Sequence, residues 1–130
     1  MKNKTLSGEC LCGEISWEMT GPFEFFGMCQ CSRCRKVTGA AFATNLFVKP
    51  DQFSWRSGKN HRNEYLLPEP NTFGNACCKT CGSRVPRKTT RGLIMIPLGS
   101  TMELPNIEPT LVCPEDHPAW FSELESIIIN

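Results

Sequence analysis

The chain has 130 residues with 14 basic and 13 acidic side chains, so its net charge is only +1. This balance argues against a nucleic-acid partner, because such proteins usually carry a strongly basic face. The length is typical of one domain, which we expect to span residues 1–130. No apolar run is long enough to predict a membrane span, and the polar start lacks the apolar segment of a signal peptide. We therefore expect a cytoplasmic protein without a membrane partner.

Short apolar segments separated by turn residues follow one another along the first half of the chain. Residues 15–19 alternate between apolar and polar side chains, which predicts a strand that ends at Gly21 and Pro22. A short helical turn is predicted over residues 33–37, ending at Gly39. Further strands are predicted over residues 23–28, 41–48 and 53–56.

The second half continues the same pattern. Strands are predicted over residues 61–67, 84–88 and 93–96, whereas residues 72–77 lead into a cysteine cluster. Recurring prolines indicate that residues 99–116 are mostly irregular. Apolar positions at helical spacing predict a short C-terminal helix within residues 120–129. Many short strands with little helix predict a mainly-β fold.

The cysteine content is the unusual feature of the composition. The nine cysteines lie at positions 10, 12, 29, 31, 34, 77, 78, 81 and 113. In a reducing compartment, dense cysteine indicates metal binding or catalysis more often than disulfides. A disulfide framework is the alternative, although the odd count would leave at least one thiol unpaired.

Cys29, Cys31 and Cys34 form the central motif, C-x-C-x-x-C. A C-x-x-C turn lets two thiolates face one ion, and the C-x-C step adds a third sulfur from the same loop. Three protein ligands are typical of a catalytic zinc that keeps one position open for water or substrate. We therefore predict a catalytic zinc site here, which we expect to be labile because one loop supplies all three sulfurs.

A fourth protein ligand would give this loop a different role. The zinc site would then be closed and structural, and the chain would be a zinc-stabilised binding module without catalysis. The candidates for that ligand are Cys77, Cys113, His61 and His117. Cys113 is more simply interpreted as a small, buried apolar residue.

Two cysteine pairs predict a second, structural zinc site. Cys10 and Cys12 belong to a C-x-C-G turn, and Cys78 and Cys81 belong to a C-x-x-C-G knuckle. Together they provide four thiolates, the number that a closed tetrahedral zinc site needs, and metal binding at such a site contributes directly to folding. Cys77 could replace Cys78, but the C-x-x-C spacing favours Cys78.

These motifs, in this order, resemble the glutathione-dependent formaldehyde-activating enzyme family, to which centromere protein V also belongs. The resemblance covers roughly residues 5–100. The matching residues are Gly8, Cys10, Cys12, Gly13, Cys29, Cys31, Ser32, Cys34, Arg35, Lys36, Thr38, Gly39, Ala40, Ala41, Phe42, Cys78, Cys81 and Gly82.

The resemblance implies an Mss4-like fold, in which zinc ties β-sheets together. It implies an enzyme that adds the glutathione thiol to formaldehyde to give S-hydroxymethylglutathione, formally a carbon–sulfur lyase working in reverse. It also implies zinc as cofactor, with glutathione or a similar thiol and a small aldehyde as the small-molecule partners. By this resemblance the four-cysteine set holds a structural zinc and the three-cysteine set holds the catalytic one.

Basic and aromatic residues supply the remaining candidates. Arg33, Arg35 and Lys36 are predicted to pair with substrate carboxylates, as a glutathione-like ligand would need, with solvated surface charges as the alternative. A second basic group is interpreted as an ordinary strand face rather than a contact for nucleic acid or an acidic partner. This group consists of Lys79, Arg84, Arg87, Lys88 and Arg91. Core packing, rather than substrate stacking, is expected for Phe42, Phe47 and Trp55.

Overall fold

The computed structural model describes residues 4–69 and 72–123. Strands predominate in these residues and helices are short, so the predicted mainly-β fold is confirmed. The strands are β1 (Thr5–Glu9), β2 (Ser16–Thr20), β3 (Phe25–Cys29), β4 (Ala43–Val48), β5 (Phe53–Ser57), β6 (Arg62–Leu66), β7 (Gly74–Cys78), β8 (Arg87–Lys88), β9 (Ile94–Pro97) and β10 (Thr110–Val112). The helical elements are α1 (Ser32–Thr38) and the 3₁₀ turns η1 (Pro50–Gln52), η2 (Leu98–Ser100) and η3 (Pro114–Asp116).

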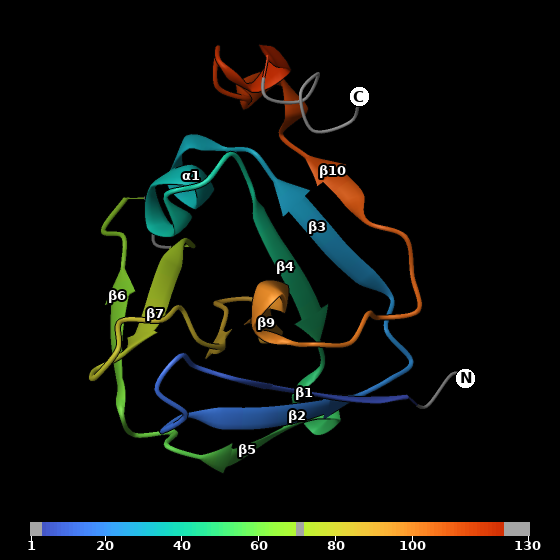
Figure 1. The fold of residues 1–130 in the computed structure, drawn as a ribbon, viewed down its shortest axis with the longest axis vertical. Helices are drawn as coiled ribbons and strands as arrows, with labels where there is room; N and C mark the ends of the chain where they lie inside the picture. The colour runs from blue at the N-terminus through green and yellow to red at the C-terminus, as the bar shows by residue number, and fades with distance from the viewer. Residues whose placement is uncertain (1–3, 70–71, 124–130) are drawn as a thin grey trace.

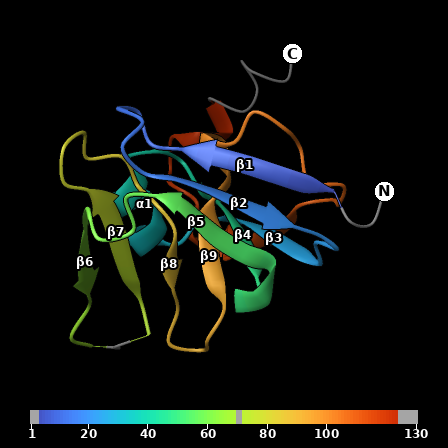
Figure 2. The ribbon, with the colours of Figure 1, turned by 90° about the horizontal axis from the view of Figure 1, so that it is seen from below.

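The strands form three sheets. All neighbouring strands pair antiparallel except at one edge of the five-stranded sheet. A three-stranded sheet has the order β1-β2-β5, a five-stranded sheet has the order β10-β3-β4-β9-β8, and β6 and β7 form a separate pair. β10 is the exception, because it pairs parallel with β3. Figure 1 and Figure 2 show that β1, β2 and β5 form one layer that lies across the strands of the larger sheet.

The core lies between these layers and is built by strand alternation. In β2, Trp17 and Met19 point inward and are almost fully buried, whereas their neighbours along the strand are partly exposed. Leu46 of β4 and Ile96 of β9 are opposite each other in the larger sheet and have no exposed surface. Burial of such side chains contributes about 1.5–3 kcal/mol each.

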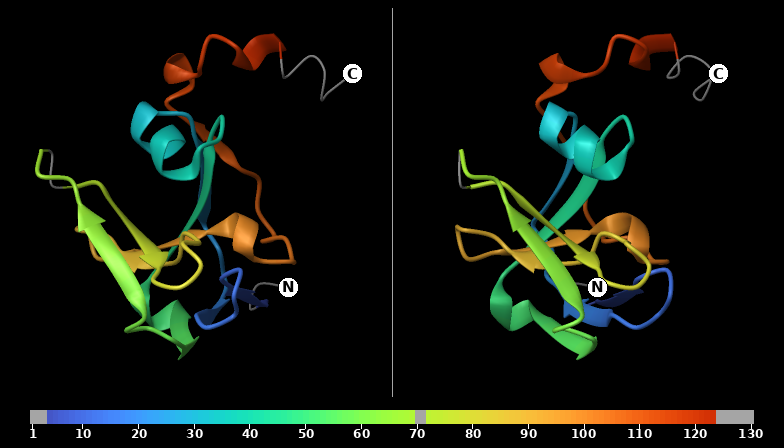
Figure 3. Two further views of the ribbon diagram at one scale, coloured as in Figure 1. Left: turned by 60° about the vertical axis from the view of Figure 1, so that its left-hand side comes forward. Right: turned by 90° about the vertical axis from the view of Figure 1, so that its left-hand side faces the viewer.

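α1 and the C-terminal part of the described chain lie at one end of the molecule, away from β1, β2 and β5 (Figure 3). α1 begins directly after the three-cysteine loop, with Cys31 as its N-cap. It ends at Gly39, whose φ of 66° is the left-handed conformation that glycine adopts without strain. The predicted helical turn is therefore confirmed, together with the residue that ends it.

Most predicted strands are confirmed, with shifts of a few residues at their ends. β1, β7 and β10 were not predicted as strands. Of the strand predicted over residues 84–88, only Arg87 and Lys88 are in β8, while Arg84 forms an isolated bridge with Cys77. The predicted C-terminal helix begins with a helical turn at residues 121–123, and its remaining residues lie outside the described part of the chain. None of the helices in residues 4–69 and 72–123 has the length and apolar character needed to cross a bilayer.

Candidate functional site

Four cysteines from two distant segments bring their sulfurs together. The Sγ atoms of Cys10, Cys12, Cys78 and Cys81 all lie within 4.8 Å of one another. Sγ of Cys12 lies 3.6 Å from that of Cys10 and 3.8 Å from that of Cys78. A tetrahedral zinc with Zn–S bonds of about 2.3 Å separates its sulfurs by about 3.8 Å. The four sulfurs therefore have the spacing of a zinc-binding tetrahedron, and the second pair of sulfurs belongs to Cys78 and Cys81, without Cys77.

Backbone amides around this cluster point at the sulfurs. The N–H of Ile15 donates to Sγ of Cys10 and the N–H of Thr80 donates to Sγ of Cys78, both at 3.4 Å. Ser83 connects the two segments, because its hydroxyl accepts from the N–H of Leu11 at 2.9 Å and lies 3.2 Å from Sγ of Cys81. The N–H groups that donate to the sulfurs favour thiolates over thiols.

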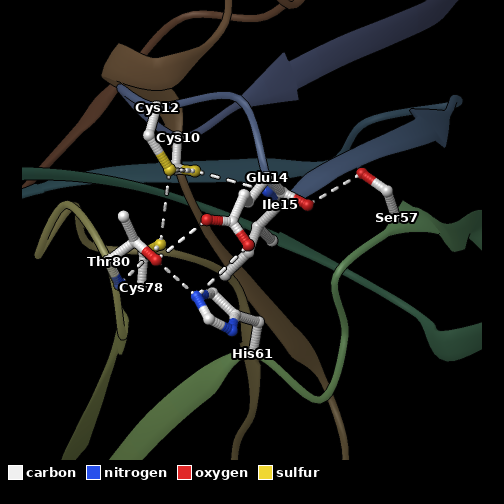
Figure 4. A network of polar contacts seen from close by, with 8 residues as sticks. All are labelled: Cys10, Cys12, Glu14, Ile15, Ser57, His61, Cys78 and Thr80. Atoms are coloured by element: carbon white, nitrogen blue, oxygen red, sulfur yellow. Dashed lines mark hydrogen bonds and ion pairs between the residues drawn. The ribbon is translucent and has the colours of Figure 1, made fainter.

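A polar network lies beside the four-cysteine cluster (Figure 4). Nε2 of His61 lies 2.6 Å from the hydroxyl of Thr80 and 3.4 Å from a carboxylate oxygen of Glu14. The Thr80 hydroxyl also donates to Glu14 at 2.9 Å. Through Glu14, His61 and Thr80 this network joins the turns before β2 and β6 to the knuckle. His61 is therefore engaged here and not at the three-cysteine loop.

The pKa values of these thiols are pushed apart by their neighbours. Hydrogen bonds with the side chain and backbone of Ser83 lower the pKa of Cys81 to about 5. The backbone amide of Glu14 lowers the pKa of Cys12, but desolvation and the neighbouring cysteine thiols raise it to about 12. Adjacent thiols of this kind do not all ionise unless a cation neutralises them. The donor set therefore fits a metal ion.

The second cluster is contributed by one loop. Cys29 ends β3, Cys31 caps α1 and Cys34 lies in its first turn, and their sulfurs lie within 4.8 Å of one another. The N–H of Cys34 donates to Sγ of Cys31 at 3.4 Å. Gln30, between the first two cysteines, is buried and its N–H donates to the carbonyl of Val112 at 2.9 Å. β10 therefore fixes the backbone of the loop from outside.

The pKa values of Cys31 and Cys34 in this loop are shifted in opposite directions. Burial raises the pKa of Cys31, but hydrogen bonds from the backbone N–H of Cys34 and from neighbouring thiols outweigh it, so the net pKa lies below that of a free thiol. Burial, together with Cys29 and Cys31, raises the pKa of Cys34. Three adjacent thiols that oppose one another's ionisation again fit a bound cation, with the three thiolates as its ligands.

No fourth metal-binding side chain completes this cluster within residues 4–69 and 72–123. Cys113 groups instead with Glu115 and Asp116, and its φ of 52° places it in the left-handed region. It is half-buried, so the interpretation as a buried apolar residue is wrong. His117 has its Nδ1 3.0 Å from the carbonyl oxygen of Pro118. The described chain therefore leaves a three-sulfur cluster.

The three cysteines line one side of a pocket of about 280 Å³. Phe25, Phe47 and Phe73 give it apolar walls, and polar groups come from Asn45, Arg84 and Arg87. A larger hollow of about 520 Å³ adjoins it and shares Phe25, Phe47, Thr72 and Thr89. A mostly apolar pocket with a few convergent polar groups is typical of a small-molecule site.

The predicted substrate residues lie elsewhere on α1. Arg33 and Lys36 are exposed, and Nε of Arg35 donates to the carbonyl of Gln30 at 3.2 Å. None of these three residues lines the pocket of the cysteines. Arg35 supports the loop backbone, whereas a role of the three in substrate binding stays a prediction.

Two arginines of the basic group that we interpreted as an ordinary strand face line the pocket. Arg87 is only 7% exposed and Arg84 is half-buried. Burial lowers the pKa of Arg84, while Cys34 and Cys29 raise it. The interpretation of this group as a plain strand face is therefore wrong for Arg84 and Arg87. Phe47, expected in the core, also lines the pocket and packs against Phe25 with ring centroids 5.8 Å apart.

Comparison with known proteins agrees with this geometry. The family model of the glutathione-dependent formaldehyde-activating enzyme matches residues 5–115. The chain belongs to this family. A Rhodobacter sphaeroides protein of known crystal structure has the same fold, with a TM-score of 0.58 and 19% sequence identity over 85% of this chain and 93% of that one. No curated protein matches the chain.

Proposed function

We propose that the chain is a zinc-dependent carbon–sulfur lyase or synthase that adds a thiol, such as glutathione, to a small aldehyde, such as formaldehyde. The observation that carries the proposal is the position of Cys29, Cys31 and Cys34 on the wall of a pocket. Family membership supports the same reaction class. A binding module would need no pocket at a three-sulfur cluster.

The two clusters are proposed to hold zinc in different ways. Cys10, Cys12, Cys78 and Cys81 would saturate a structural zinc, which joins the segment after β1 to the knuckle after β7. Cys29, Cys31 and Cys34 would hold a second zinc with three sulfurs. When bound there, zinc supplies a Lewis acid that keeps a substrate thiol deprotonated.

The protein's own groups would bind and orient the reactants. The rings of Phe25, Phe47 and Phe73 line the pocket together with the three cysteines and would give the reactants an apolar surface. In the reaction, the thiol sulfur forms a bond to the aldehyde carbon and the carbonyl oxygen takes up the thiol's proton. Nδ2 of Asn45 lies 4.0 Å from Sγ of Cys34 and its Oδ1 accepts from Arg84, so we assign both residues to orienting the polar end of the reactants.

Exchange NMR with and without the protein tests this reaction. We expect the zinc-loaded protein to contain two zinc ions per chain and to accelerate exchange between formaldehyde, a thiol and their adduct. The matched controls are free zinc without protein and Cys77→Ala, since Cys77 belongs to neither cluster. Two bound zinc ions without any acceleration for glutathione or smaller thiols would favour the binding module.

A further inference from the structure

A buried cation, Arg87, and a half-buried one, Arg84, line the pocket without a carboxylate partner. Nε of Arg84 donates to Oδ1 of Asn75 at 2.7 Å, and its Nη1 donates to Oδ1 of Asn45 at 3.0 Å. Nη1 of Arg87 donates to the carbonyl of Lys88 at 3.1 Å. Among the described residues, neither guanidinium has an acidic partner within 4.0 Å. These partners are neutral, so the hydrogen bonds do not neutralise either charge.

The nearest acidic side chain to Arg87 is already engaged. Glu64 affects Arg87 only over a longer distance, and its carboxylate pairs with Arg62 at 3.4 Å. A buried charge without a partner is strongly unfavourable, and proteins tolerate it mainly where a ligand or metal site compensates. An anion bound in the pocket would provide that compensation.

The charges of a zinc-loaded cysteine cluster and of the two arginines leave one guanidinium available for a ligand. Three thiolates around a divalent zinc carry a net charge of −1, which one guanidinium balances. Arg84 is the one linked to the cysteines, because its Nη1 donates to Oδ1 of Asn45, whose Nδ2 lies 4.0 Å from Sγ of Cys34. Arg87 then remains as a buried cation in the same pocket. The pocket is therefore suited to a ligand that carries a negative charge.

The fold keeps space for the Arg87 guanidinium. A Cβ at Gly74 would lie 3.0 Å from Cζ and 3.2 Å from Nη2 of Arg87. Gly74 begins β7 and lines the same pocket. The missing side chain therefore lets the guanidinium lie against β7 on the pocket wall.

The small size of the pocket that Arg84 and Arg87 share with the cysteines limits the length of the ligand. Nδ2 of Asn45 is 4.0 Å from Sγ of Cys34, and Oδ1 of the same amide accepts from Arg84. Arg84 is thus linked to Cys34 through one amide group, and Arg87 lines the same pocket. Glutathione carries both of its carboxylates beyond a peptide bond from its thiol. The pocket volume of about 280 Å³ is also at the small end of ligand sites.

We propose that the preferred thiol of this chain is a short mercapto acid, whose carboxylate binds Arg87 while its thiol reaches Cys29, Cys31 and Cys34. This inference rests on the proposed function, and it replaces glutathione as the preferred thiol. The hollow beside the pocket has exposed cations, Lys49 and Arg91, which remain solvated and therefore select a carboxylate less strongly.

Calorimetric titration of the zinc-loaded protein tests this proposal without measuring turnover. The probes are 3-mercaptopropionate, its uncharged amide and glutathione. We expect the acid to bind about tenfold more tightly than the amide, as one charge-assisted hydrogen-bonded pair predicts, and more tightly than glutathione. Equal binding of acid and amide, or tighter binding of glutathione, would overturn the proposal.

Arg87→Met locates the carboxylate, and Lys88→Met is its matched control because Lys88 is exposed and lies outside this pocket. We expect Arg87→Met to remove the difference between acid and amide and Lys88→Met to retain it. If Arg87→Met does not fold, propionate is used as a competitor of 3-mercaptopropionate on the unmodified protein, which tests whether the pocket binds a carboxylate. Absence of competition contradicts the proposal. Preference for the acid without any turnover would contradict the proposed function and leave the binding site standing.

Discussion

Cys81→Ser should unfold the protein or leave it insoluble. The substitution removes one of four sulfurs that join the segment after β1 to the knuckle after β7. Metal binding at such a site is folding free energy, so we expect the free energy of unfolding to fall by more than about 4 kcal/mol. That loss approaches the total of about 5–15 kcal/mol that stabilises a typical domain. Thermal unfolding with zinc analysis measures it.

Cys77→Ser is the matched control for this change. Cys77 is the neighbour of Cys78 in β7, is half-buried and lies outside both sulfur clusters. We expect it to keep its zinc and to melt within a few degrees of the unmodified protein. A Cys81→Ser protein with unchanged melting temperature and full zinc content would show that the four-cysteine site does not hold the fold together.

Cys31→Ala should have the reverse effect, with loss of activity and little loss of stability. Cys31 is one of the three sulfurs on the pocket wall. Its structural role is to cap α1, where its Sγ accepts from the N–H of Cys34 at 3.4 Å. Replacing an N-cap by alanine costs about 0.5–2 kcal/mol. We expect the rate of adduct exchange to fall at least about a hundredfold, since even changes around metal ligands cost about 10–100-fold.

The comparison for this variant is Cys77→Ala, which should keep both the rate and the stability. Circular dichroism and exchange NMR on the same samples separate folding from activity. A Cys31→Ala protein that retains most of its rate would remove the three-cysteine loop from the reaction, whatever its zinc content.

Local patterns in the sequence were sufficient for most of the strands, and the exceptions have physical reasons. β1 was missed because one of its two inward positions is Gly8, which has no side chain to reveal the alternation. A Cβ at Gly8 would lie 2.8 Å from the Trp17 ring, so the close packing of β1 on β2 needs glycine there. β10 was missed because it is a three-residue edge strand whose Leu111 is 54% exposed.

The sulfur clusters could be predicted from spacing, whereas the pocket could not. C-x-C and C-x-x-C turns determine locally where sulfurs point, and the structure groups the cysteines as four and three. Arg84 and Arg87 are brought to the cysteines by the path of the chain after the knuckle, which no short pattern encodes. Arg33, Arg35 and Lys36 were chosen for their position beside the motif in sequence, and none of them lines the pocket.

The central claim is that the two sulfur clusters hold zinc with different strength and for different purposes. One loop supplies all three sulfurs of the pocket cluster, whereas the other cluster joins distant segments. Stepwise addition of a mild chelator, with zinc content, circular dichroism and adduct exchange followed together, tests this most directly. We predict that one zinc leaves first, that activity is lost with it and that the fold persists until the second zinc is removed. Loss of both zinc ions in a single step with unfolding, or activity that survives removal of the first, would contradict the account.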